Sequence, residues 1–548
     1  PATTISIPSS ITSIGSNVFS NGNITDVYCY AATPVTTSTF NGGLSYATLH
    51  VPEFSVVAYK VHDSWYKFNI VALDELLSDV YINSDYTIVD YNGLADEVNL
   101  TLDRNAHLTV TAGSEFNLNN YKQITSNTEY YEYDNNWNYT YYYPSTLITY
   151  NEMNADNVEV SLVLRTDRWN FISLPFDVNV SDITYPEGTL WVVRKYSGED
   201  RANMTGNTWH NMTDGMTLNA GEGYILHCDH ANNSYVTFTF PAVNNESMNN
   251  MFAYQDFEQH LEIYPSEFAH NRSWNLVGNP YPSYFNTNGN IEHNGIITVW
   301  DNAYVAYSLL DDYFTLKPYE SFFVQCPDDA TSMLFKTEGR SHTNDYDDYS
   351  KRDEAFRQRN SGDRKIYNFT LNNEEYSDRT RLVLNEAASV DYELSCDASK
   401  FMNEDENVPQ IYVFDNKVMY AINERPLGLG VMSLGIRIGQ AGEYTLTLDP
   451  KEEYGLKVVL YDNETREEID ILNGSYTFFA EEGYDNNRFV LTITENTIGV
   501  DENYVLDIND PDVEVYDIYG RRVRVSDVKN GLYILRKGDK VQKCFINE

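Results

Sequence analysis

The chain has 548 residues and is strongly acidic, with 81 Asp and Glu residues against 37 Lys and Arg and a formal net charge of −44. A chain this negative repels phosphate groups, so the composition argues against binding to nucleic acids or to anionic lipid headgroups. No run of about 18 apolar residues occurs, so no membrane-spanning segment is predicted.

The length predicts roughly three to five domains. Aromatic residues make up 14% of the chain, and tyrosine alone occurs 45 times, which favours strands because these side chains suit a pleated, half-buried surface. The predicted fold is therefore mainly β, a multi-domain string of antiparallel β-sandwich modules. The cysteines are few, odd in number and far apart, which argues against a disulfide framework or a zinc ribbon. They are Cys29, Cys228, Cys326, Cys396 and Cys544.

Residues 1–72 have the pattern of a terminal repeat. The stretch "ISIPSSITSIGSNVF" spaces small apolar residues with Ser, Gly and Asn, and it resembles one repeat of the BspA-like leucine-rich family. The following segment resembles the end of such arrays, where a short helix carrying Tyr59 and a Trp65–Phe68 pair cover the open hydrophobic face. The resemblance implies an N-terminal leucine-rich-repeat cap remnant. Because the chain begins at Pro1 inside this pattern, we expect a processed or truncated N-terminus.

Residues 73–160 form a predicted short β-rich module with an aromatic hairpin. In "YYEYDNNWNYTYYY", Asp134 to Asn136 supply a turn between two alternating aromatic runs. The alternation is compatible with packing against a neighbouring sheet, which we favour, and with an exposed face that binds a ligand by ring stacking. The candidate ligand-binding residues are Tyr131, Tyr133, Trp137, Tyr139, Tyr141 and Tyr143.

Residues 161–340 contain an internal duplication. "DRWNFISLPFDV" at 167–178 parallels "RSWNLVGNPYPS" at 272–283, and "NAGEGYILHC" at 219–228 parallels "KPYESFFVQC" at 317–326. We predict one or two duplicated β-sandwich modules with the tryptophans of the paired strands in the core. The paired segments resemble a β-rich module of large surface proteins of the Bacteroidota.

A polar linker is predicted at residues 341–364, because nearly every residue there is polar or charged. Residues 365–498 then show short strand-like runs separated by Asn, Asp and Gly, a spacing typical of an antiparallel β-sandwich. This ordering resembles the sandwich that precedes sorting domains in secreted proteins of the same phylum.

The last segment, residues 499–548, is similar to a type IX secretion C-terminal sorting domain. In that family a strand ends in a Tyr-Asp-x-x-Gly-Arg motif and a Gly-x-Tyr strand follows. The matching residues are Tyr516, Asp517, Gly520, Arg521, Gly531 and Tyr533. The final strand, "VQKCFINE", departs from the plainer basic ending of the family.

Motifs of catalysis are absent from the sequence: there is no G-x-S-x-G, H-E-x-x-H, P-loop or G-x-G-x-x-G after a strand. We therefore predict neither an enzyme nor a cofactor. The cluster His227-Cys228-Asp229-His230 has metal-ligand types, but its duplicate keeps only Cys326, which favours a structural cysteine, and no metal site is predicted. The acidic composition would suit calcium, yet no EF-hand-type loop supports it.

The leading hypothesis is a non-catalytic extracellular or outer-membrane surface protein. It would act in adhesion or in binding a glycan or protein ligand, and it would be exported or anchored by machinery that its C-terminal domain engages. One alternative is the C-terminal accessory region of a secreted enzyme or protease whose catalytic domain lies upstream. Another is a structural subunit of a surface layer or filament, which would bury the aromatic hairpin between protomers.

Overall fold

The computed structural model describes most of the chain. It omits residues 1–2, 16–17, 19–22, 38–46, 114–115, 134–136, 244–251, 253, 294, 301–302, 328–330, 345–363, 404, 427–430, 450–454, 496–505, 530, 539 and 547–548.

The prediction of a mainly β chain is confirmed: 52% of the structure is strand and 6% is helix, and antiparallel sheets predominate. Contacts divide the chain into two compact units. The first comprises residues 1–265, 273–293 and 312–353, and the second residues 266–272, 294–311 and 354–548. Within the described residues, no helix combines the length and apolar character needed to cross a membrane.

The first unit begins with a small parallel sheet in the order β1 (Thr4–Ile7), β3 (Asp26–Cys29), β5 (Thr48–Val51) and β6 (Asn69–Ala72). A short helix, α1 (Val56–Val61), follows β5. Tyr59, Trp65 and Phe68 are buried beside the sheet with Val27 and Leu49, so the side chains expected to form a cap do form the core of this segment. The relation of this segment to leucine-rich repeats stays a prediction.

Two parallel sheets follow, where antiparallel strands were expected. One contains β7 (Leu77–Ile82), β9 (Leu94–Leu102), β11 (Phe116–Thr125) and β15 (Met153–Arg165), and the other β8 (Tyr86–Ile88), β10 (His107–Val110) and β14 (Thr146–Thr149). The chain alternates between the sheets, so each strand of one sheet is the crossover for the other. Residue alternation is the same in both pairing modes, so the sequence pattern did not distinguish them.

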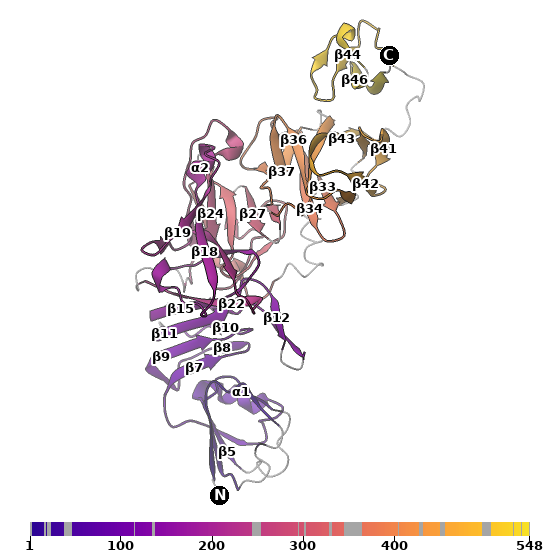
Figure 1. Ribbon diagram of the computed structural model, residues 1–548. Helices are drawn as coiled ribbons and strands as arrows, with labels where there is room; N and C mark the ends of the chain where they lie inside the picture. The colour runs from indigo at the N-terminus through magenta and orange to yellow at the C-terminus, as the bar shows by residue number, and fades with distance from the viewer. Residues whose placement is uncertain are drawn as a thin grey trace. The chain divides into compact units, whose positions relative to one another are not determined.

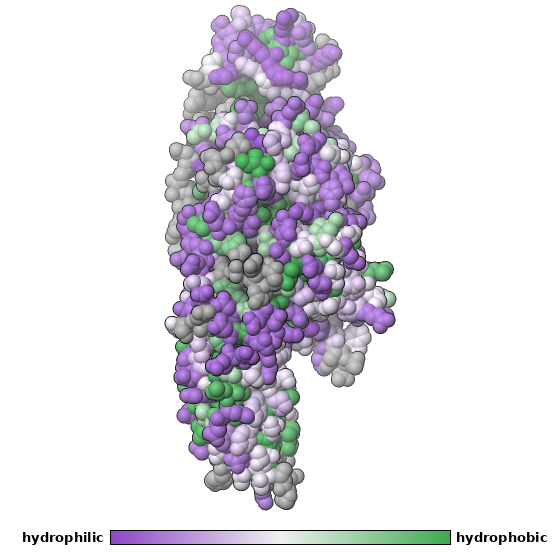
Figure 2. Space-filling view, turned by 90° about the vertical axis from the view of Figure 1, so that its left-hand side faces the viewer, coloured by the Kyte–Doolittle hydropathy of each residue, from purple (hydrophilic) through white to green (hydrophobic). Residues whose placement is uncertain are grey.

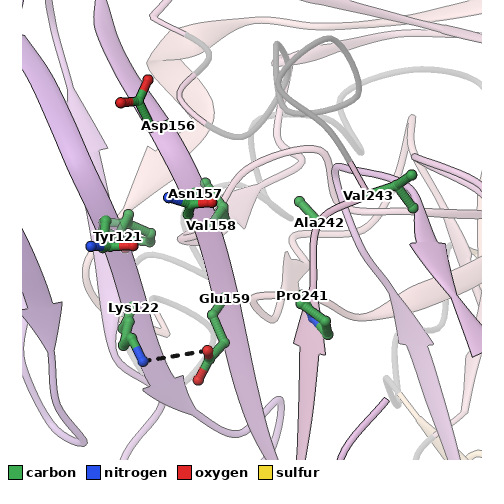
Figure 3. Close-up of a pocket in the computed structure, with 10 residues that line it drawn as sticks. Tyr121, Lys122, Asp156, Asn157, Val158, Glu159, Pro241, Ala242 and Val243 are labelled. Carbon is green, nitrogen blue, oxygen red and sulfur yellow. Dashed lines mark ion pairs between the residues drawn. The ribbon is translucent and has the colours of Figure 1, made fainter. Parts of the chain in front are cut away.

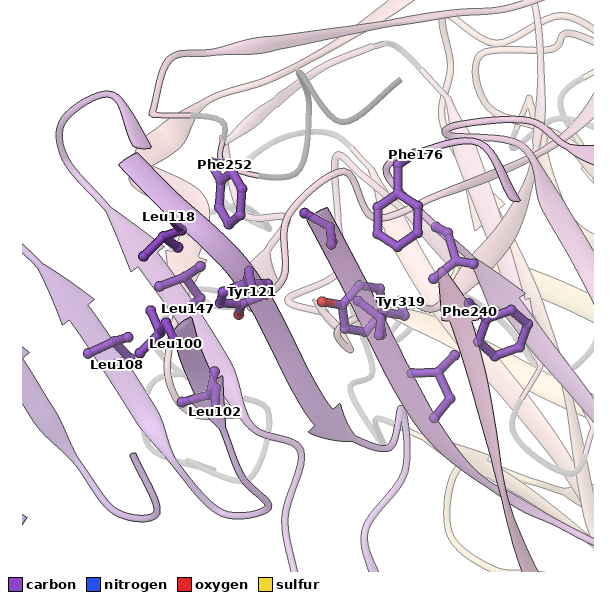
Figure 4. Close-up of a cluster of buried hydrophobic side chains, with 14 of the residues drawn as sticks. Leu100, Leu102, Leu108, Leu118, Tyr121, Leu147, Phe176, Phe240, Phe252 and Tyr319 are labelled. Carbon is purple, nitrogen blue, oxygen red and sulfur yellow. The ribbon is translucent and has the colours of Figure 1, made fainter. Parts of the chain in front are cut away.

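The interior of these coils is filled by large apolar side chains that occupy equivalent positions on successive strands (Figure 4). Val80, Leu100, Tyr121 and Val158 are register partners across the four parallel strands, and all are buried. The buried amide of Gln123 lies among them: its Oε1 accepts hydrogen bonds from the hydroxyls of Tyr121 and Tyr319, and its Nε2 donates to Ser145 O. Because every coil contributes to one continuous core, the strands stabilise one another as in a repeat protein.

Two histidines meet at the second parallel sheet: His107 is the first residue of β10, and His342 lies beside it. His342 uses both ring nitrogens, at 2.7 Å from Thr109 Oγ1 and 2.6 Å from Thr146 Oγ1, and its ring centroid is 5.6 Å from that of His107. Burial, together with the charge of His107, lowers the pKa of His342 to about 4, against 6.5 for a free histidine. Burial also lowers the pKa of His107, while Asp85 opposes that shift. The fold therefore favours the uncharged rings.

We expect the first unit to lose stability as the pH falls from about 6.5 towards 4. Residue 342 binds a proton more tightly in the unfolded chain than in the folded protein, so its contribution to the free energy of unfolding is complete above pH 6.5 and declines below it. The full loss is at most about 3 kcal/mol, and screening by solvent reduces it. A His342→Gln variant should show a shallower pH dependence in urea unfolding. The exposed His260→Gln is the control, and identical pH profiles for His342→Gln and wild type would contradict the expectation.

The internal duplication is visible in the strand pairing of the first unit. β16 (Trp169–Ser173) pairs with β21 (Gly223–Asp229), and β24 (Trp274–Gly278) pairs with β30 (Ser321–Gln325), both antiparallel. Trp169 lies opposite His227 in the first pair, and Trp274 opposite Gln325 in the second, which is the correspondence the aligned sequences predict. Of the two tryptophans, only Trp274 is fully buried.

The asparagine after each tryptophan shows the duplication at the level of atoms. Asn170 Oδ1 accepts a hydrogen bond from Arg165 N at 3.2 Å, and its Nδ2 donates to Arg165 O at 2.9 Å. Asn275 makes the same two bonds to the backbone of Glu262, at 2.8 and 2.9 Å. Each side chain thus replaces a backbone partner beside its strand, which gives the asparagine the same structural role in both copies.

The second unit is dominated by one nearly closed, barrel-like sheet. Its strand order is β41-β40-β43-β38-β36-β37-β34-β33-β39-β42, and β35 pairs with β37. These are β33 (Lys365–Asn372), β34 (Ser377–Leu384), β35 (Ala398–Ser399), β36 (Gln410–Asp415), β37 (Val418–Arg425), β38 (Val431–Ile438), β39 (Gly442–Asp449), β40 (Leu456–Asp462), β41 (Glu467–Asp470), β42 (Tyr476–Ala480) and β43 (Gly483–Glu495). Leu434, Val458 and Phe489 are fully enclosed in its apolar core, and the ion pair of Lys400 with Asp378 is buried as well. The domain boundary expected at residue 365 stays a prediction.

The last strands of the sequence form a small sheet in the order β45 (Arg522–Val523), β44 (Glu514–Tyr516), β46 (Gly531–Lys537) and β47 (Lys540–Ile546). Among the described residues, its small core consists of the buried side chains of Leu506, Val513, Val515 and Leu535. All its described pairings are antiparallel.

Candidate functional site

The aromatic hairpin is an excursion from the parallel coils. It leaves after β11, forms β12 (Tyr130–Tyr133) and β13 (Tyr139–Tyr142), and returns to β14 (Figure 1). The two strands are antiparallel, with Tyr131 opposite Tyr141 and Tyr133 opposite Tyr139. The predicted turn at 134–136 lies outside the described residues. The paired runs confirm the hairpin that the alternating tyrosines predict.

All six candidate residues face solvent. Their exposed fractions run from 41% for Tyr141 to 83% for Trp137. Packing against a neighbouring sheet, the interpretation favoured from sequence, is therefore wrong for this face of the hairpin. Alternation alone could not decide this, because a strand face has the same pattern whether a second sheet or water covers it.

The exposed rings form one continuous row, which we call the aromatic stripe (Tyr131, Tyr133, Trp137, Tyr139, Tyr141 and Tyr143). Neighbouring ring centroids are 5.0 Å apart for Tyr141 and Tyr143, 5.4 Å for Tyr131 and Tyr133, and 6.1 Å for Tyr133 and Trp137. The rings across the two strands are 6.4 and 6.5 Å apart. Most are inclined to one another by 49° to 82°, so the stripe is an uneven surface and not a flat plate.

The opposite face of the hairpin holds it to the coils. Tyr130 is buried and packs against the rings of Tyr142 and Tyr235, with centroids 5.0 and 4.9 Å apart. The guanidinium of Arg104 lies 4.9 Å from the centroid of Tyr142 and forms an ion pair with Glu132. Because one face is anchored, the other face is held out in a fixed orientation before any ligand arrives.

Asn105 fixes the base of the hairpin through backbone bonds. Its Oδ1 accepts from Tyr143 N at 2.5 Å and its Nδ2 donates to Tyr141 O at 3.4 Å. Asn105 has a positive φ of 64°, which asparagine tolerates better than most residues. Sequence reasoning missed both anchors, although "DRNA" at 103–106 is a polar turn between two strand runs and could have marked them.

The electrostatics at the stripe are negative. The hydroxyl of Tyr141 donates to a carboxylate oxygen of Glu129 at 3.2 Å. Partial desolvation, together with this charge and hydrogen bond, raises the pKa of Tyr141. The phenol therefore stays a neutral donor near pH 7. Within the described part of the chain, the hydroxyls of Tyr131, Tyr133, Tyr139 and Tyr143 have no protein hydrogen-bond partner, so they are free to bond to water or to a ligand.

Surface hydropathy does not reveal this site. Tyrosine and tryptophan are close to neutral on a hydropathy scale, and on the face drawn in Figure 2 hydrophilic residues predominate with scattered hydrophobic ones between them. The stripe is recognised instead by the exposed fractions and contacts of its rings.

A hollow in the surface lies where β11 and β15 meet the end of β22 (Tyr235–Pro241) (Figure 3). It measures about 360 Å³, and an ion pair between Lys122 and Glu159, 3.4 Å apart, crosses the two strands at its side. Both partners are half exposed, so the pair contributes little stability. The lining residues do not combine a nucleophile, a base and an oriented donor, so they do not indicate a catalytic site.

His227 and Cys228 point to opposite sides of β21. The ring of His227 lies edge-on to Trp169, 5.3 Å away, while the thiol of Cys228 is buried and donates to Arg165 O. Among the residues that the structure describes, no group of three His, Cys, Asp or Glu side chains is placed to hold a metal ion.

The C-terminal motif residues form a turn and the strand beside it. Asp517 Oδ1 accepts hydrogen bonds from the backbone of Tyr519 and Arg521, and its Oδ2 pairs with Arg521 Nε at 2.8 Å. Gly520 occupies the left-handed region with φ of 72°, where a side chain would be strained. Tyr516 ends β44, and Gly531 and Tyr533 lie on β46, which pairs with β44.

Comparison with known proteins gives one partial match. A family model described as a domain of unknown function (DUF8693) matches residues 312–493. No curated protein and no solved structure is significantly similar to the chain.

Proposed function

We propose that the protein is a non-catalytic binding protein of the cell exterior, which holds a macromolecular ligand on its aromatic stripe. The observation that carries the proposal is the row of six contacting aromatic side chains, all at least 41% exposed, on a hairpin whose other face is anchored. Exposed aromatic patches of this size usually mark interaction surfaces.

The energetics favour binding. A tyrosine or tryptophan buries about 150–250 Å² when it is fully covered, at about 25 cal/mol per Å² of apolar surface. Tyrosines lose little side-chain entropy on ordering and present both a ring and a hydroxyl, which suits both glycan and protein ligands. Since Tyr130 and Arg104 already fix the hairpin, little further ordering opposes association.

The resemblances at the two ends of the chain support an extracellular location. A leucine-rich-repeat end and a C-terminal sorting domain both belong to secreted or surface-anchored proteins, and the net charge of −44 suits solubility outside the cell. In this proposal the C-terminal sheet engages the export or anchoring machinery. The missing catalytic motifs support a binding role over an enzymatic one.

The test compares wild type with a Trp137→Ala/Tyr139→Ala variant on a glycan array and on an array of extracellular matrix and surface proteins. We expect wild type to bind a ligand and the variant to lose at least tenfold in affinity, because two exposed ring contacts are removed. A Phe479→Ala/Tyr484→Ala variant, which removes two exposed rings from the barrel-like sheet, should bind as wild type does.

Equal binding by wild type and the stripe variant, or no binding by either, would contradict the proposal. Light scattering on the same proteins tests the filament alternative. Self-association that the stripe substitutions abolish would show that the stripe joins protomers instead of binding a separate ligand.

A further inference from the structure

Three exposed tyrosines elsewhere in the chain, Tyr66, Tyr150 and Tyr519, are covered by the chain's own cations, whereas among the described residues no cation lies over Tyr185, Tyr254 or Tyr484. Lys67 lies 5.6 Å from the ring centroid of Tyr66, Arg340 lies 5.3 Å from Tyr150, and Arg521 lies 5.2 Å from Tyr519. These three rings are 53% to 58% exposed, a range that overlaps that of the stripe. A ring face has a negative potential, so a nearby cation stabilises it.

The stripe lacks this cover. Among the described residues, no lysine or arginine lies over any of its six rings. Arg104 stands over Tyr142 on the opposite face and is held there by Glu132. The carboxylate at the base of the stripe, that of Glu129, is bonded to a tyrosine hydroxyl and not to a cation. In the part of the chain that the structure describes, six electron-rich ring faces and the Glu129 carboxylate are thus exposed together with no cation over the rings.

We propose that the partner of the stripe is a basic segment of another protein, with arginine or lysine side chains laid over the tyrosine and tryptophan rings. The inference rests on the binding role proposed above and names its ligand chemistry. The net charge of −44 would draw such a segment towards the protein, and the rings with Glu129 would then hold its cations. Arginine is the better fit, because its planar guanidinium stacks on aromatic faces.

The ring spacing indicates how the basic residues are arranged. Along the strands, neighbouring centroids are 5.0 to 6.1 Å apart. In an extended peptide, side chains at positions i and i+2 share a face and are about 6.6 Å apart. An extended segment that runs along the hairpin strands, with arginine at every second position, therefore places its guanidinium groups at a spacing close to that of the rings.

The probe is a synthetic peptide of alternating Arg and Ser, titrated into the full chain by fluorescence anisotropy. Wild type is compared with Tyr139→Leu/Tyr141→Leu, which removes two rings at constant charge and similar volume. We expect about tenfold weaker binding by the variant. Weaker binding is also expected for a Lys-Ser peptide, and at raised salt. A Phe479→Leu/Tyr484→Leu variant should match wild type, and far-ultraviolet circular dichroism checks that each variant folds.

Equal affinity of wild type and the Tyr139→Leu/Tyr141→Leu variant for the peptide would overturn the inference, because binding would then reflect only the overall negative charge. If a neutral oligosaccharide such as cellohexaose, and not the peptide, bound in a stripe-dependent way, the inference would fail while the binding role stood. If no probe and no array ligand depended on the stripe, both proposals would fail.

Discussion

Replacing Lys400 by Met is expected to destabilise the barrel-like sheet by about 3–5 kcal/mol. Lys400 and Asp378 form an ion pair whose two side chains are 1% and 2% exposed, with Nζ 2.6 Å from Oδ1. Burial raises the pKa of Asp378 and lowers that of Lys400, and each partner's charge opposes the shift of the other. Without Lys400, the carboxyl group would be left in the interior with no counter-charge.

The hydrogen bonds around the pair add to this effect. Asp378 Oδ2 accepts from the backbone of Ile411 at 2.7 Å, and Lys400 Nζ donates to Arg379 O at 2.9 Å. The methionine cannot donate, so the Arg379 carbonyl would lose a partner as well. Hydrogen exchange measured by mass spectrometry over residues 365–449 reports the loss without requiring the whole multi-domain chain to unfold in one step.

Two further variants make this prediction specific. Lys457→Met changes an exposed lysine on β40 of the same sheet and should leave exchange unchanged. Asp378→Leu with Lys400→Met removes both charges and should recover most of the lost protection, because an apolar pair avoids the buried charge. Exchange in Lys400→Met that matches wild type would show that the pair is not a structural requirement.

Replacing Trp65 by Ala is expected to cost about 3–5 kcal/mol in the N-terminal segment. Trp65 is fully buried, its indole Nε1 donates to Val35 O at 2.8 Å, and its ring centroid is 5.7 Å from Tyr59 and 5.5 Å from Phe68. Alanine would leave a cavity among these rings and an unpaired carbonyl. The parallel sheet of four short strands has few other large side chains with which to compensate.

The measurement is limited proteolysis of residues 1–72, with mass spectrometry of the fragments. Tyr66→Ala is the matched control, because Tyr66 is the next residue in the chain but its ring is 55% exposed and does not belong to the core. We expect rapid cleavage in the Trp65→Ala protein alone. Equal resistance of both variants would mean that the N-terminal segment does not depend on this core.

The sequence predicted most of what alternation and repetition determine. The tyrosine hairpin and the correspondence of Trp169 with Trp274 agree with the structure, because strand period and duplicated motifs are local signals. The parallel pairing of β7, β9, β11 and β15 was not predicted, because pairing direction depends on partners distant in the chain.

In the candidate site, too, the local features could be predicted from the sequence and the long-range ones could not. Its six residues could be named from sequence, but whether water or a second sheet covers them could not, and the expectation that they are packed was wrong. The anchors Arg104 and Asn105 precede Tyr130, where the hairpin begins, by 26 and 25 residues. The motif "DRNA" marks a turn there, but that this turn contacts the hairpin depends on how the coils stack.

Hydroxyl-radical footprinting of the free and ligand-bound protein is the decisive test of binding at the aromatic stripe, because it reports the accessibility of individual aromatic side chains. We expect Trp137 and Tyr139 to be among the most rapidly oxidised residues of the free protein, and bound ligand to protect the stripe while Phe479 and Tyr484 do not change. Slow oxidation of the stripe in the free protein, or oxidation that the ligand leaves unchanged, would contradict it.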